Sequence, residues 1–177
     1  MKKIAIIIRG SVGVGKSTAA DGIQKALGSR VSKVTLDDGW AEGEFRYAGD
    51  STRYSDLVSE SPILLVELAY GEPAGDVFPG ATKNPAEWAD ILRKDRREIF
   101  LFKLSADWET TRKHLARRKQ PESDQKAWHA RYEEADWKSL PQKLNLQEIE
   151  IDTAITPPNM VIDIILATLN KASEKGA

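Results

Sequence analysis

Short apolar runs alternate with segments of helical periodicity along most of the chain. The first run, residues 3–9, is rich in β-branched residues and ends at Gly10. Such a run is typical of a parallel strand that is buried on both faces. Further apolar runs predict strands at residues 31–36, 63–66, 99–104 and 146–151.

Helical patterns separate these strands. Residues 16–27 predict a helix with Gly28 as its C-terminal cap, and its expected buried face comprises Ala19, Ile23, Ala26 and Leu27. Asn84 can cap a helix that starts at Pro85 and has Trp88, Ile91 and Leu92 on one apolar face. Further helices are expected at residues 107–118 and 122–137. A last helix starts at Pro157-Pro158, with an apolar face of Val161, Ile162, Ile165, Leu166 and Leu169.

This alternation predicts an α/β fold. Strands that alternate with helices at such spacing imply a parallel sheet with helices on both faces and a ligand at the carboxyl ends of the strands. Residues 1–177 contain no internal repeat and no convincing linker, so one domain is expected. Residues 40–61 have weak periodicity, and residues 69–84, with three glycines and two prolines, predict a long exposed loop.

A phosphate-binding pattern lies between the first strand and the first helix. It has the form Gly-x-x-x-x-Gly-Lys-Ser and comprises Gly10, Ser11, Val12, Gly13, Val14, Gly15, Lys16 and Ser17. Its amide groups and the helix N-terminus are expected to bind phosphate oxygens. Lys16 is expected to reach the β- and γ-phosphates, Ser17 to ligate Mg²⁺, and Thr18 to lie near the α-phosphate. The alternative is a chance glycine turn with a solvated lysine, and the flanking strand and helix argue against it.

The P-loop, the aspartate after the second strand and an arginine-rich helix together resemble the nucleoside-kinase-like branch of the P-loop proteins. Adenylate, shikimate and gluconate kinases, polynucleotide kinase and chloramphenicol phosphotransferase belong to this branch. The resemblance covers nearly the whole chain as topology, while only the P-loop is specific as sequence. It implies a three-layer fold, a five-stranded parallel sheet of order 2-3-1-4-5, and ATP and Mg²⁺ as cofactors.

Asp37 is the candidate base, at the expected carboxyl end of the second strand. Members of the branch that phosphorylate a hydroxyl often place a carboxylate there, and an alcohol attacks poorly unless its proton is accepted. Asp38 is the competing assignment. Asp-Asp-Gly is also an ordinary turn sequence, so a catalytic role and a turn both remain open.

Glu67 follows the third expected strand, where the branch normally has an aspartate that holds Mg²⁺. The glutamate leaves three roles open: metal ligand, base or substrate-binding residue. A plain first solvated position after a buried strand is the remaining alternative.

The sequence His114-Leu115-Ala116-Arg117-Arg118 resembles the Arg-Leu-x-x-Arg pattern that opens the lid in these kinases. Arg118 falls on the second arginine and is expected to offset charge on the transferred phosphoryl group. The lid-like segment is placed near residues 112–137. A solvated basic face is the alternative, and it is preferred for Arg112, Lys113 and Lys119, while His114 is expected to be a surface residue.

Residues 152–156 match the loop of the branch that packs near the adenine, although a plain connection is an equal alternative.

The amino-acid composition limits the kinds of partner that the chain is expected to bind. The 26 basic and 27 acidic residues give a formal net charge of −1, so no global field favours nucleic acid or anionic lipid. There is no cysteine, no apolar stretch long enough to span a bilayer and no secretory leader pattern. These features favour a cytoplasmic protein. The resemblance implies a small-molecule acceptor as partner, and a monomer or homodimer is expected.

The expected function is ATP-dependent transfer of the γ-phosphate to a hydroxyl group of a small molecule. A nucleoside monophosphate kinase is the first alternative, because a phosphate acceptor needs arginines more than a base. A non-catalytic nucleotide-binding switch is the second. A regulatory GTPase is disfavoured because Asn-Lys-x-Asp and Asp-x-x-Gly are both missing from the sequence.

Overall fold

Five strands form one parallel sheet. The computed structural model describes residues 3–34, 61–68, 96–116, 121–134 and 140–175. Within these ranges the sheet has the order β2-β3-β1-β4-β5, and every neighbouring pair is parallel. The strands are β1 (Ile4–Arg9), β2 (Val31–Val34), β3 (Ile63–Leu68), β4 (Glu98–Ser105) and β5 (Glu148–Asp152). The α/β class and the strand order expected from the resemblance are confirmed.

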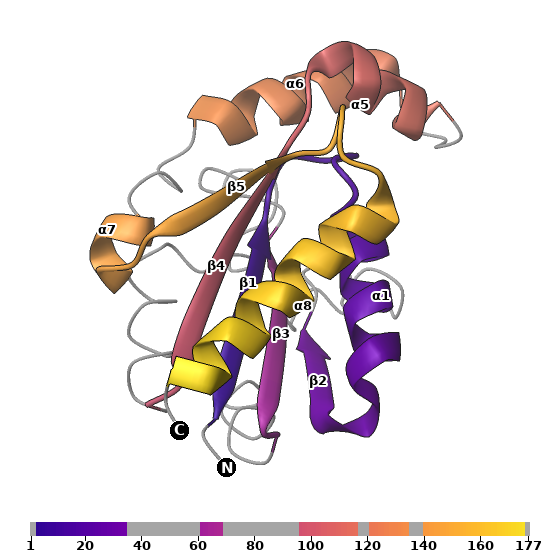
Figure 1. Cartoon of the computed structure of the whole chain (residues 1–177). Coiled ribbons are helices and arrows are strands. Elements are labelled where there is room, and N and C mark those ends of the chain that lie inside the picture. Colours follow the sequence, from indigo (N-terminus) through magenta and orange to yellow (C-terminus); the bar gives the residue numbers. More distant parts are fainter. Residues whose placement is uncertain (1–2, 35–60, 69–95, 117–120, 135–139, 176–177) are drawn as a thin grey trace.

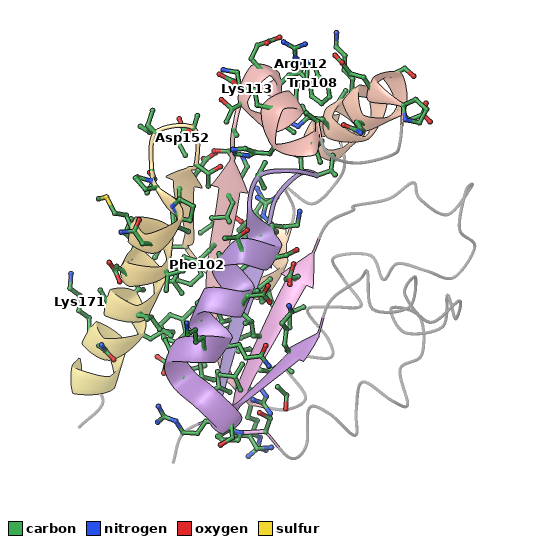
Figure 2. The ribbon with its side chains drawn as sticks, turned by 90° about the vertical axis from the view of Figure 1, so that its right-hand side faces the viewer. Phe102, Trp108, Arg112, Lys113, Asp152 and Lys171 are labelled. Atoms are coloured by element: carbon green, nitrogen blue, oxygen red, sulfur yellow. The ribbon has the colours of Figure 1, made fainter. Side chains whose placement is uncertain are left out.

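Two long helices cover one face of this sheet, and two others lie beyond the carboxyl ends of its strands. Helices α1 (Lys16–Leu27) and α8 (Pro158–Lys175) run side by side against the sheet, as both views show (Figures 1 and 2). Helices α5 (Trp108–Leu115) and α6 (Glu122–Glu134) lie above the ends of β1 and β4 (Figure 1). The short helix α7 (Leu140–Leu144) precedes β5, and a 3₁₀ turn (Gly28–Arg30) leads from α1 to β2.

The core lies between the sheet and the pair α1 and α8. Alternate residues of the strands point to opposite faces. Ile6 and Ile8 of β1 share the cluster of α1 and α8 side chains, and Phe102 of β4 points toward these helices (Figure 2). Together with Ile23 of α1 and Ile165 of α8 they belong to one hydrophobic cluster, and all five side chains are fully buried. Burial of each such side chain contributes about 1.5–3 kcal/mol. Ile7 of β1, which points to the opposite face, is equally buried, so β1 is buried on both faces as expected.

The helix predictions are confirmed in outline. Helix α1 has the predicted bounds, and Gly28, with φ of 67°, is its C-cap. The buried stripe of α1 follows the i, i+3, i+4, i+7 spacing and comprises Lys16, Ala19, Ala20 and Ile23. The expectation for Ala26 is wrong, because this stripe leaves it on the exposed edge. In α8 the first residue is Pro158, and the predicted apolar face is buried or partly buried.

Several element boundaries differ from the prediction. Strand β3 continues to Leu68 because β1 continues to pair with it up to Arg9, so Glu67 lies within the strand. Helix α5 begins after Asp107, whose Oδ1 accepts a hydrogen bond of 2.7 Å from the backbone N–H of Thr110. This bond, accepted by the ionised carboxylate, holds the pKa of Asp107 below its ordinary value. Helix α7 was not predicted. The expectations for residues 35–36, 40–60 and 69–92 lie outside the described residues.

Candidate nucleotide-binding site

The P-loop joins β1 to α1 and turns through three glycines with positive φ. These are Gly10 (156°), Gly13 (80°) and Gly15 (90°). A Cβ atom at Gly10 would lie 2.3 Å from the backbone oxygen of Leu104, so the loop passes directly against β4. At Gly13 a Cβ would lie 2.8 Å from the Leu115 side chain, so α5 also packs on the loop. Glycine is therefore required at both positions by close approach as well as by conformation.

Lys16 closes the loop. Its Nζ donates a hydrogen bond of 2.7 Å to the backbone oxygen of Ser11, and the residue is 8% exposed. The side chain of Lys16 thus spans the curled loop and binds the backbone five residues earlier. This contact places a positive charge where the loop amides converge, and an anion at that position would meet both.

A hydroxyl and a carboxylate meet at the start of α1. The Ser17 Oγ donates a hydrogen bond of 2.9 Å to Oε2 of Glu67, which is 4% exposed on β3. The other carboxylate oxygen, Oε1, has no hydrogen-bond partner among the described residues. A buried acceptor without a partner beside a hydroxyl fits Mg²⁺, which takes oxygen ligands and usually combines one or two carboxylates with phosphates. Ser17 and Glu67 are therefore the residues that can hold this metal.

Lys33 of β2 approaches the same carboxylate. Its Nζ lies 3.4 Å from Glu67 Oε1, an ion pair that is not also a hydrogen bond, and 2.7 Å from Oδ1 of Asp21 on α1. Burial on its own would lower the pKa of Lys33, but the hydrogen bond to Asp21 and the charge of Glu67 raise it overall. Lys33 is therefore a firmly charged cation beside the candidate metal ligands.

The P-loop opens into a cavity of about 480 Å³. Three parts of the chain form its wall: the loop with Glu67, the end of α5, and the connection from β5 to α8. The lining residues are Val12, Gly13, Val14, Gly15, Lys16, Ser17, Thr18, Ala19, Glu67, Leu104, His114, Leu115, Thr153, Ala154, Thr156, Pro157, Pro158 and Val161. Residues 12–18 of the expected phosphate-binding loop thus share one cavity with part of the segment expected near the adenine.

Hydrogen bonds shape the β5–α8 connection. Asp152, labelled near the top of Figure 2, accepts a hydrogen bond of 2.9 Å from the backbone N–H of Ala154 through its Oδ1. The backbone N–H of Thr153 donates to the backbone oxygen of Ser105 over 2.8 Å, which ties the connection to β4. This wall of the cavity is therefore anchored to the sheet.

The fold is similar to those of several solved structures. No protein-family model matches the chain, and no curated protein matches it. The YorR protein from Bacillus subtilis, solved in complex with phosphorylated GDP, has 17% identity and a TM-score of 0.67, covering 96% of this chain and 98% of that chain. A gluconokinase from Sinorhizobium meliloti 1021 has 16% identity and a TM-score of 0.61, with 97% and 94% covered. A deoxyadenosine kinase from M. mycoides with bound dATP has 15% identity and a TM-score of 0.55, with 94% and 100% covered.

The chain has the fold of the P-loop kinases. The segment near residues 112–137, expected from the sequence to be lid-like, includes the end of α5 and all of α6. Arg112 and Lys113 are exposed at the outer end of α5, as preferred for a solvated face (Figure 2). Lys119 lies outside the described residues. Arg112 forms an ion pair of 3.0 Å with Glu109, one turn earlier in the helix.

Both histidines of the chain contact the P-loop. The Nδ1 of His114 lies 2.9 Å from the backbone oxygen of Gly13, and because a carbonyl only accepts, this nitrogen carries the proton. The Nδ1 of His129 on α6 lies 2.8 Å from the Ser11 hydroxyl. The His129 ring also packs on Trp108, with ring centroids 5.7 Å apart. From the sequence, His114 is expected only as a surface residue, and it is exposed, while no role is expected for His129. Both contacts depend on how α5 and α6 pack, which no local motif signals.

The structure describes only some of the predicted site residues. The structure brings together Lys16, Ser17, Thr18 and Glu67, while Asp37, Asp38 and Arg118 lie outside the described residues. Among the helices that the structure describes, none combines the length and apolarity needed to cross a membrane.

Proposed function

We propose that the chain is an ATP- and Mg²⁺-dependent phosphotransferase that moves the γ-phosphate to a hydroxyl group of a small molecule. The observation that carries the proposal is the curled P-loop, with Lys16 across it and the Ser17–Glu67 pair at its end, opening on one cavity. The cavity volume of about 480 Å³ lies in the range of small-molecule sites.

The residues of the loop would bind the nucleotide phosphates. The Lys16 ammonium would leave the Ser11 backbone oxygen and pair with a phosphate oxygen, which exchanges a neutral acceptor for a charged one. Loop amides would donate to the remaining phosphate oxygens, and the N-terminus of α1 would add its partial positive charge. When bound, Mg²⁺ would be held by Ser17 and Glu67 and would neutralise phosphate charge.

The opposite wall of the cavity would bind the adenine ring of the nucleotide. Thr153, Ala154 and Thr156 line the cavity from the β5–α8 connection, and His114 and Leu115 line it from α5. Since the backbone oxygen of Gly13 accepts the hydrogen bond from Nδ1–H of His114, Nε2 would be the acceptor nitrogen of the neutral ring. The ring thus has a fixed polarity toward a ligand.

Transfer to a hydroxyl would use Asp37 as the base and Arg118 as a lid arginine, roles that follow from the resemblance. Structural neighbours include proteins described as a sugar kinase, a gluconokinase and a deoxyadenosine kinase, and sugars and nucleosides are alcohols. The neighbour in complex with phosphorylated GDP keeps a nucleoside monophosphate kinase as the second candidate. We assign the reaction to the cytoplasm, because a chain without cysteine needs no disulfide and suits a reducing compartment.

An ATP-consumption screen tests the proposal. The purified chain is incubated with ATP, Mg²⁺ and panels of nucleosides, nucleotides, sugars, short metabolites and antibiotics. ATP consumption is measured, and the mass of each product is determined by mass spectrometry. The expected result is one chemical class whose members gain the mass of a phosphoryl group on a hydroxyl, with no product from Lys16→Ala. Phosphoryl transfer only to nucleoside monophosphates would instead establish the second candidate, and absence of ATP binding would refute both.

A further inference from the structure

A lysine ammonium lies beside the carboxylate of the candidate metal ligand Glu67. Lys33 lies on β2, beside β3, and its Nζ is 3.4 Å from Glu67 Oε1. This is the oxygen that has no hydrogen-bond partner among the described residues, while Oε2 is occupied by the Ser17 hydroxyl. The ammonium therefore faces the one carboxylate oxygen that is available to a metal ion or to its bound water.

Lys33 also has a second carboxylate within reach. Asp21 Oδ1 accepts its hydrogen bond at 2.7 Å, and the Asp21 side chain is 67% exposed, so water solvates that end of the pair. A lysine is a compact charge on a flexible stem, so it can move away from Glu67 while it keeps Asp21. The arrangement thus offers the ammonium two positions, one shared by both carboxylates and one on Asp21 alone.

A divalent cation at Ser17 and Glu67 would meet this ammonium at short range. Like charges repel strongly in a site as enclosed as that of Glu67, which is 4% exposed. Metal binding would therefore displace the ammonium toward Asp21, and metal release would let it return to Glu67. The carboxylate would be neutralised in both states.

We propose that Lys33 is a tethered cation of the metal site, which pairs with Glu67 when the metal is absent and lowers the affinity of the site for Mg²⁺. Asp21 receives the ammonium when the metal binds. This inference rests on the proposed function, because it takes Ser17 and Glu67 as the metal ligands. Its consequence is a site in which the buried Glu67 carboxylate has a cationic partner with and without the metal.

The test measures metal binding directly, with Mn²⁺ as the probe. Mn²⁺ is titrated into the protein saturated with a non-hydrolysable ATP analogue, and free Mn²⁺ is followed by electron paramagnetic resonance. Lys33→Met is expected to bind Mn²⁺ about tenfold more tightly than the wild type, because a repelling charge is removed. Affinity for the analogue in EDTA is expected to change by less than about twofold, since Lys33 acts on the metal.

Lys103→Met is the matched control. Lys103 on β4 is 19% exposed against 20% for Lys33, and it also pairs with a glutamate, Glu150, at 2.9 Å. Lys103 lies between Phe102 and Leu104 in the strand, and both of these point into the core. Because side chains alternate along a strand, Lys103 points to the opposite face of the sheet, away from Glu67. The same loss of charge there is expected to leave Mn²⁺ affinity within about twofold of the wild type.

Asp21→Asn supplies an effect of opposite sign. Without the Asp21 charge the ammonium would stay on Glu67, so Mn²⁺ affinity is expected to fall, by about threefold. In the Lys33→Met background the same substitution is expected to have a smaller effect, because the ammonium through which it acts is gone. Equal effects of Asp21→Asn in both backgrounds would overturn the role given to Asp21.

The outcomes separate this inference from the proposed function. Unchanged Mn²⁺ affinity in Lys33→Met, or an equal gain in Lys103→Met, would overturn the role of Lys33 and leave the phosphotransferase standing. A wild type that binds the analogue but no Mn²⁺ would overturn both the metal site and the inference. If Lys33→Met does not fold, Lys33→Gln removes the charge, keeps a donor for Asp21 and is expected to give the same gain.

Discussion

Lys16→Ala removes the ammonium that spans the P-loop, and its effect on nucleotide binding can be worked out in advance. In the wild type, ATP with Mg²⁺ at 100 times its Kd would stabilise the folded chain by about 2.7 kcal/mol. For a domain of this size about 2–4 °C of Tm correspond to each kcal/mol, so the expected rise is roughly 5–11 °C. If the loss of Lys16 weakens ATP about 100-fold, the same ATP concentration equals the Kd of the variant. The stabilisation then falls to about 0.4 kcal/mol, or roughly 1 °C.

Thermal unfolding followed by circular dichroism, with and without ATP and Mg²⁺, measures this difference. Lys25→Ala is the control. Lys25 is an exposed lysine in the last turn of the same helix, so this substitution removes the same charge at a position away from the loop. It is expected to keep the full shift of the wild type. Equal shifts in wild type and Lys16→Ala would refute the assignment of Lys16, whatever the activity of either protein.

Three further predictions concern the base, the lid and the loop. Asp37→Asn should leave ATP binding intact and lower turnover by roughly 10²-fold, with a milder effect of Asp38→Asn; turnover within a few-fold of wild type would favour the nucleotide-kinase alternative. Arg118→Ala should lower kcat by about 10²-fold with little change in ATP affinity, and unchanged kcat would return Arg118 to the solvated face. Gly10→Ala should lower Tm by roughly 2–12 °C, because the new Cβ meets the Leu104 backbone oxygen and overpacking costs about 1–3 kcal/mol. Gly28→Ala, whose Cβ meets no atom of the described residues within 4 Å, should cost less, and equal losses would contradict the steric reason.

Local patterns account for the part of the structure that the sequence predicted. The run before Gly10, the switch to helical spacing at Lys16 and the glycine after Leu27 each act within a few residues, and β1, the P-loop and α1 follow. The order of the strands came from the resemblance, because apolar runs do not say which strands are neighbours. Helix α7 spans only Leu140–Leu144, too short to display a repeat of buried positions, and it was missed.

Contacts between distant residues were beyond local patterns. Ser17 and Glu67 are 50 positions apart, and Ser11 and His129 are 118 apart. Each pair meets because separate elements share the carboxyl end of the sheet, where side-chain direction depends on strand register and helix packing. The strand order brings β2 next to β3, yet only the register and the length of the side chain bring Lys33 to Glu67.

The geometry around Glu67 bears on the three roles that the sequence left open. A general base or an acceptor-binding carboxylate needs an oxygen that faces the acceptor, whereas Glu67 is 4% exposed and its two oxygens face the Ser17 hydroxyl and the Lys33 ammonium. Because β3 runs on to Leu68, the carboxylate leaves the strand before its end. The longer glutamate side chain then extends it toward the start of α1, where an aspartate on the same backbone would end one methylene short. The position, the partners and the residue type therefore favour the metal-ligand role over the other two.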